Sequence, residues 1–228
     1  MQERDPLYPE TVLGGRRGGR LGASLRFLGN ALRERPLPRR ILGAFSIVLI
    51  VGGAALMAYP IATDLYAEWR QSGLERQLGD PSTRTAYLER TIRPGDALTR
   101  IKIPRLGVDA VVVEGISLAA LRAGAGHYPA TALPCEEGNT AIAGHRTTYS
   151  EPFGELHRLR VGDRIVLETP IGRCHYEVSR DPWVTTPYDT SVLEIRRGSA
   201  LTLTTCDPPG SAASRLIVRA RLVQTELG

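Results

Sequence analysis

The chain has 228 residues, and its 29 basic against 24 acidic side chains give a formal charge of +5. Residues 1–40 hold nine basic and four acidic side chains, so the remainder is neutral and a nucleic-acid-binding surface is excluded. A hydrophobic share of 42% with 23% charged residues excludes a disordered chain, and three cysteines are too few for a disulfide scaffold.

The N-terminal tail over residues 1–40 has glycines interspersed with arginines and little periodic apolar signal. We therefore expect it to be mostly disordered, although a short helix over 21–33 is possible.

A charge-free run follows over residues 41–63. At about 1.5 Å per residue it spans the ~30 Å hydrocarbon core of a bilayer, which favours a transmembrane helix over a buried core helix or a cleaved signal peptide. Arginines precede the run, whereas Asp64 and Glu68 follow it, so the positive-inside rule predicts a cytoplasmic N-terminus and an extracellular remainder. The expected outer aromatic belt consists of Tyr59, Tyr66 and Trp69.

Residues 64–95 are predicted to form an extracellular connector. A helix is plausible over 65–78, ending at Gly79, and a second short one over 85–93. Together they would space a domain away from the membrane.

From residue 96 onward the pattern is typical of strands, and we expect one domain over 96–228. Short apolar or alternating runs separated by Pro- and Gly-rich loops predict an all-β sandwich or barrel, with one short helix over 117–123. The expected strands cover residues 98–103, 108–113, 140–143, 164–168, 173–178, 201–206 and 216–222.

Cys206 is the first candidate for chemistry, because it ends a strand-like segment and an odd cysteine count leaves one thiol unpaired. A cysteine nucleophile needs a basic or cationic partner. His145 also ends a strand-like run and is the best partner by position, with His127 second. Arg215 opens the final strand, where a guanidinium can bind a substrate carbonyl or an oxyanion.

Three segments now carry a family resemblance. Residues 201–206 (LTLTTC), 143–149 (AGHRTTY) and 215–220 (RLIVRA) resemble the signature segments of sortases, membrane-anchored cysteine transpeptidases of Gram-positive bacteria. Residues 126–134 (GHYPATALP) and 153–165 (FGELHRLRVGDRI) are similar to segments of the actinobacterial class E group. The resemblance implies an eight-stranded β-barrel with a groove for the sorting signal, preceded by one transmembrane helix.

The resemblance also implies a mechanism. Cys206 would attack the Thr–Gly bond of an LAxTG- or LPxTG-like signal, His145 would protonate the leaving amine, and Arg215 would hold the substrate or oxyanion. An amine of a peptidoglycan precursor would then resolve the thioester. Tyr128 is a candidate for reading the signal's second position, and Thr205 for shaping the groove floor. No metal and no cofactor is expected.

Other interpretations remain open at this point. The chain could be a pilus-assembling sortase or an inactive membrane-anchored binding module, whereas an L,D-transpeptidase is disfavoured because the His-Gly-Cys motif is absent. Asp181-Pro182-Trp183 resembles the lid of pilus-type sortases but lies between His145 and Cys206, where that lid does not occur. Cys135 and Cys174 could pair in an oxidising compartment, but their spacing does not decide it.

Overall fold

The computed structural model of the protein describes residues 36–194 and 198–227. The chain divides into two compact units, Met1–Leu56 and Met57–Gly228. The expectations of a disordered tail and of a short helix over 21–33 concern residues that lie outside the described part.

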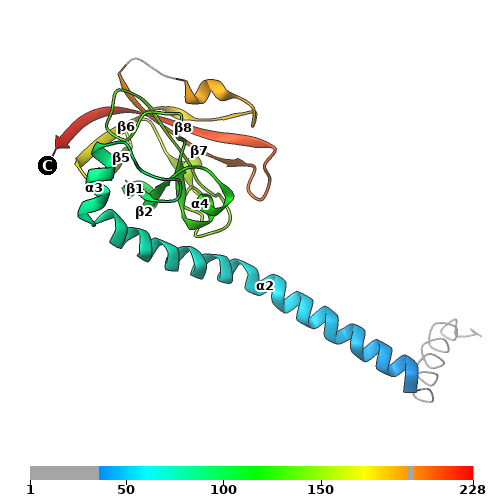
Figure 1. Ribbon diagram of the computed structural model, residues 1–228. Helices are drawn as coiled ribbons and strands as arrows, with labels where there is room; N and C mark the ends of the chain where they lie inside the picture. Colours follow the sequence, from blue (N-terminus) through cyan, green and yellow to red (C-terminus); the bar gives the residue numbers. More distant parts are fainter. Residues whose placement is uncertain (1–35, 195–197, 228) are drawn as a thin grey trace, which may run out of the picture. The chain divides into compact units, whose positions relative to one another are not determined.

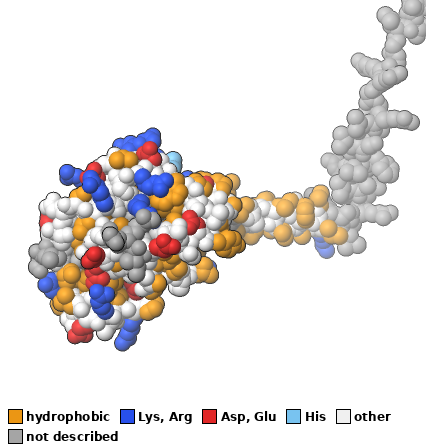
Figure 2. Space-filling view, turned by 90° about the horizontal axis from the view of Figure 1, so that it is seen from above, with side chains coloured by type: hydrophobic (Ala, Val, Ile, Leu, Met, Phe, Trp, Pro, Cys, Tyr) orange, Lys and Arg blue, Asp and Glu red, His pale blue; other side chains and the backbone are white. Residues whose placement is uncertain are grey.

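Helix α2 runs without interruption from Pro36 to Leu78 (Figure 1). It joins the predicted span over 41–63 to the helix expected over 65–78. By length and composition it is a candidate membrane span, and its most apolar stretch is not buried by the protein. Figure 2 shows hydrophobic side chains covering the exposed part of this helix. One candidate membrane helix near the N-terminus is therefore present, as the sequence predicted.

Residues 97–227 contain a closed eight-stranded barrel with the strand order β1-β2-β3-β4-β7-β8-β6-β5, which confirms the predicted fold. The strands are β1 Ala97–Ile103, β2 Val108–Glu114, β3 Ala125–His127, β4 Gly138–Ala143, β5 Arg164–Thr169, β6 Gly172–Thr185, β7 Ser199–Asp207 and β8 Ser214–Leu227. The short helices are α3 Pro81–Leu88, α4 Leu118–Ala123 and the 3-10 turns η1 Pro104–Leu106, η2 Leu156–Arg158 and η3 Thr190–Leu193.

Period-two alternation builds the barrel core. In β7, Leu201 and Leu203 alternate along the strand and are fully buried. They belong to one buried hydrophobic cluster, which also contains side chains from the other strands of the barrel. The other members of this interior include Ile101, Ile142, Phe153, Leu167, Tyr176 and Val218.

Strand β3 is the element that the sequence missed, because three residues are too few to show a period. It pairs parallel to β2 and antiparallel to β4. Strand β4 in turn pairs parallel to β7, with Ala143 opposite Thr204, although about 60 residues separate them. These long-range pairings bring the end of β4 beside the end of β7.

Cys135 and Cys174 form a disulfide, with their Cα atoms 5.6 Å apart. It ties the loop between β3 and β4 to strand β6, and Cys174 is fully buried. The backbone N–H of Cys135 also donates to the hydroxyl of Tyr176 at 3.1 Å. The pairing that the sequence left open is thus present, and Cys206 is the free thiol.

Candidate active site

Two of the predicted catalytic residues lie on adjacent paired strands, and the third follows the end of the strand next to them. Cys206 of β7 is directly opposite Arg215 of β8 in the antiparallel ladder. Ala143 of β4 is opposite Thr204, and the strands are parallel, so His145 reaches the level of Cys206 two residues further along. The N–H of Gly144 donates to the carbonyl of Thr204 at 3.1 Å and extends the ladder toward these residues.

Side chains on the two faces of β7 lie in different surroundings. Cys206 and Thr204 have the opposite parity to the core residue Leu203, so they point away from the barrel interior. Thr205 is buried, and its hydroxyl donates to the carbonyl of Gly144 at 2.8 Å. Thr205 therefore contacts the segment that carries His145.

His145 is half-buried in the loop after β4. Its ring lies 5.3 Å from that of Tyr149, and the guanidinium of Arg122 in α4 lies 6.0 Å from the Tyr149 ring. Burial lowers the pKa of His145 below its ordinary value, and the positive charge of Arg122 lowers it further. The neutral imidazole is thus favoured over the imidazolium.

Arg146 is a residue of the site that our sequence reasoning missed. It is almost fully buried, and its Nη1 donates to the carbonyl oxygen of Cys206 at 3.1 Å and to the carboxylate of Asp207. These bonds join the loop after β4 to the end of β7. Its place directly after His145 was the available signal, but a surface arginine would look the same in sequence.

Arg215 and Tyr128 line one cavity of about 220 Å³. Nη1 of Arg215 donates to the carbonyls of Ala212 and Ser214, at 3.1 and 2.9 Å, which leaves its other N–H groups available for a ligand. The Tyr128 hydroxyl is 3.4 Å from Oγ1 of Thr204, which also lines the cavity.

The wall of this cavity is built by η3, between β6 and β7. Asn139 donates through Nδ2 to the carbonyl of Val192 at 2.9 Å, and it accepts a hydrogen bond from Thr202 at 2.7 Å. This buried chain of bonds connects η3 to β4 and β7. Apolar Val192 and Leu193 and the polar Asp189 then contribute to the lining.

His127, the second choice as a partner for the thiol, is committed elsewhere. It is 1% exposed, with Nδ1 2.8 Å from a carboxylate oxygen of Glu114 and Nε2 3.0 Å from the carbonyl of Ala132. Both ring nitrogens are therefore engaged within the fold. Within residues 36–194 and 198–227 there is no cluster of three or more His, Cys, Asp or Glu side chains suited to a metal ion.

Comparison with known proteins gives a match to the sortase domain family over residues 101–223. Sortase SrtE1 of Streptomyces coelicolor is 35% identical over an alignment of 149 residues, and the match covers 59% of this chain and 42% of that protein. The chain thus spans less than half the length of this relative.

Solved structures of sortases also resemble this chain. Sortase E of Streptomyces avermitilis superposes with a TM-score of 0.55 at 38% identity, covering 59% of this chain and 93% of that one. A sortase D5 transpeptidase of Clostridium perfringens reaches a TM-score of 0.60 at 31% identity, covering 72% and 99%. With the family match extending over more than half of its residues, and with class E proteins among its relatives, this chain belongs to the sortase family of transpeptidases.

Proposed function

We propose that this sortase cleaves a C-terminal LAxTG- or LPxTG-like sorting signal between Thr and Gly and joins the new carboxyl end to a cell-wall amine. The observation that carries the proposal is that Cys206 of β7 pairs with Arg215 of β8, while His145 directly follows the end of β4, the other neighbour of β7. A strand end provides a rigid base for a nucleophile. The bond from the Gly144 N–H to the Thr204 carbonyl and the bond from the Thr205 hydroxyl to the Gly144 carbonyl hold the two strand ends together.

In the first step the Cys206 thiolate attacks the Thr carbonyl carbon. The C–N bond to Gly breaks, a thioester forms on Sγ, and the departing amine takes a proton from the imidazolium of His145. In the second step the acceptor amine attacks the thioester carbonyl carbon and gives a proton to the imidazole. The C–S bond breaks, the new amide leaves, and the Cys206 thiolate and His145 imidazolium are restored. Burial and the charge of Arg122 lower the pKa of His145, so the imidazolium that the first step requires is less favoured than in an exposed histidine.

Arg215 is proposed to donate to the carbonyl oxygen whose charge grows in each tetrahedral intermediate. Its position opposite Cys206 and on the cavity lining supports this role. Tyr128, on the same lining, is proposed to contact the signal's second residue, with Ala favoured there. Thr205 is proposed to act through its bond to Gly144, which holds the groove floor in place.

Localisation is part of the proposal. The basic tail would lie in the cytoplasm and α2 would cross the membrane, so that the domain over 96–228 meets secreted proteins and peptidoglycan precursors outside. The partners would be sorting-signal peptides and a precursor amine. Polymerisation of pilins by the same chemistry is the second candidate, and a binding module without catalysis is the third.

Peptide cleavage tests the proposal directly. The full chain in detergent should cleave an LAxTG peptide, with hydroxylamine accelerating turnover by capturing the thioester. Cys206→Ala and His145→Ala should abolish cleavage. Arg215→Ala should reduce kcat by roughly 10²- to 10³-fold, the usual loss when an oxyanion donor is removed.

Arg221→Ala is the matched control, because Arg221 lies on the same strand and is exposed, with a 3.5 Å ion pair to Glu177. It should leave cleavage unchanged. Cleavage by Cys206→Ala at the wild-type rate would refute the thioester mechanism. A preference of the wild-type chain for Pro over Ala at the signal's second position would overturn the assignment of Tyr128, and so would a preference for Ala that Tyr128→Ala leaves unchanged.

A further inference from the structure

The part of α2 that follows the apolar run packs against the barrel through one face. Thr63, Ala67 and Leu74 are buried, at the spacing that places residues on one side of a helix. Leu74 joins a hydrophobic cluster with Val111 of β2 and Ala123 of α4. The connector is therefore part of the folded domain, and its position is defined by contacts.

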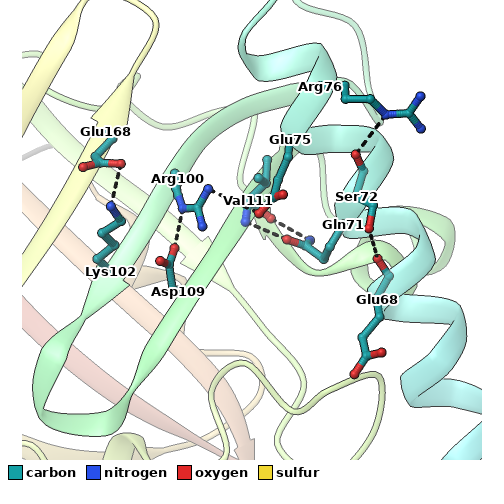
Figure 3. A network of polar contacts seen from close by, with 10 residues as sticks. All are labelled: Glu68, Gln71, Ser72, Glu75, Arg76, Arg100, Lys102, Asp109, Val111 and Glu168. Carbon is teal, nitrogen blue, oxygen red and sulfur yellow. Dashed lines mark hydrogen bonds and ion pairs between the residues drawn. The ribbon is translucent and has the colours of Figure 1, made fainter.

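Gln71 sets the position of this helix along the barrel. Its Nε2 donates to the carbonyls of Val111 and Ala123 at 3.0 and 2.7 Å, and its Oε1 accepts from the N–H of Val111 at 2.7 Å. Figure 3 shows the Gln71 amide pointing at Val111, with the ion pair of Glu75 and Arg100 beside it. Because the amide binds both backbone groups of one residue, a sliding or rotation of the helix would break all three bonds.

About two turns closer to the apolar run, α2 contacts the loop that follows His145. The N–H of Ser150 donates to Oδ1 of Asp64 at 2.8 Å. The ring of Tyr66 meets that of Tyr149 edge-on, with 6.4 Å between their centroids, and the Tyr149 ring also lies 5.3 Å from the ring of His145. A continuous series of contacts thus leads from α2 to the imidazole.

The same loop has an unusual backbone. Tyr149, Ser150 and Glu151 have φ angles of 54°, 58° and 34°, in the left-handed region that non-glycine residues avoid. Three such residues in succession persist only where surrounding contacts hold them, and strained backbone of this kind clusters at functional sites. The bond from Asp64 goes to the middle residue of the three.

We propose that α2 is a positioning element for His145, in which Asp64 holds the strained loop and Tyr66 supports the tyrosine that packs on the imidazole. This inference rests on the proposed role of His145. It makes the C-terminal part of α2 a part of the active site that acts through the loop over residues 149–151. Loss of either contact lets the loop relax and moves the imidazole away from the position required for proton transfer.

The test compares Asp64→Ala with Asp64→Asn in the full chain in detergent. Asp64→Ala should lower kcat for peptide cleavage by roughly 10- to 100-fold, the scale of loss for a catalytic group displaced by about 1 Å, with KM within about twofold of wild type. Asp64→Asn should restore most of kcat, because the amide oxygen also accepts a hydrogen bond from Ser150. Tyr66→Phe should behave like wild type and Tyr66→Ala like Asp64→Ala.

Leu65→Ala is the matched control, since Leu65 lies between the two residues and is 62% exposed. A second measurement is independent of turnover: the NMR resonances of the His145 ring, assigned with His145→Gln. The ring is faced by Tyr149 and, beyond it, Arg122, so release of the loop should shift its resonances in Asp64→Ala and not in Leu65→Ala.

The two proposals fail in different ways. If the wild-type chain cleaves no sorting peptide, the proposed function fails, and the His145 resonances still decide whether α2 positions the ring. If wild type cleaves and Asp64→Ala matches it in kcat and in the His145 resonances, the positioning role alone is overturned. Equal losses in Asp64→Ala and Asp64→Asn would also overturn it, because the hydrogen-bond acceptor would then not be the cause.

Discussion

Reduction of the disulfide between Cys135 and Cys174 should lower the free energy of unfolding by about 4 kcal/mol. The two cysteines are 39 residues apart in sequence. Closing a loop of that length removes about 13 cal/mol/K of chain entropy from the unfolded state, which gives this value at room temperature. For a unit of this size the melting temperature should fall by roughly 8 to 16 °C.

The assay is thermal and urea unfolding of the detergent-solubilised chain with and without a phosphine reductant, followed by near-UV circular dichroism. The Cys206→Ala background is used, because it leaves no free thiol to exchange with the disulfide. Mass spectrometry establishes how many thiols are free in each sample.

Cys135→Ala combined with Cys174→Ala provides the control, and its stability should not respond to the reductant. The reasoning is refuted if a fully reduced chain unfolds within about 1 kcal/mol of the oxidised one. The cross-link would then add nothing to the constraint that β5, β6 and the β3–β4 loop already impose on one another.

Two more predictions concern the surroundings of His145. Arg122→Gln should raise the His145 pKa toward its ordinary value and move the acid limb of the kcat/KM profile to higher pH. Because Arg122 is exposed, the difference between wild type and variant should shrink in high salt. An acid limb that does not move at low salt would contradict Arg122 as a cause of the lowered pKa. Gly144→Ala would place a Cβ 2.6 Å from the buried ring of Phe153, so it should destabilise the chain by about 1 to 3 kcal/mol and slow peptide cleavage. Gly73→Ala is the control, because a Cβ on Gly73 of α2 meets no atom within 4 Å. It should neither lower the stability in thermal unfolding nor slow cleavage in the peptide assay.

Local patterns in the sequence were sufficient for most of the barrel. The segment predicted as a strand over 98–103 is β1 Ala97–Ile103, and the hairpin predicted around residues 169–172 joins β5 to β6. Alternation and turn residues act over a few positions, so they are visible in one sequence. The charge-free run indicated the candidate membrane helix for the same reason.

Long-range contacts were decided only by the tertiary structure. Strand ends and residue chemistry pointed to His145, Cys206 and Arg215, but their alignment follows from the register of β4, β7 and β8. The sequence could not decide the bond from Arg146 to the Cys206 carbonyl or the pairing of Cys135 with Cys174, because each joins positions far apart in the chain.

Helix α2 shows which features the sequence predicted and which only the tertiary structure decided. Its apolar composition and the charges on either side of it determined that the chain carries a candidate membrane span and where the basic excess lies. That the same helix continues to Leu78 and contacts the loop after His145 depended on Gln71 and Asp64 finding backbone partners on the barrel. Composition and periodicity belong to a segment alone, whereas a hydrogen bond across the fold exists only once both segments have been packed in register.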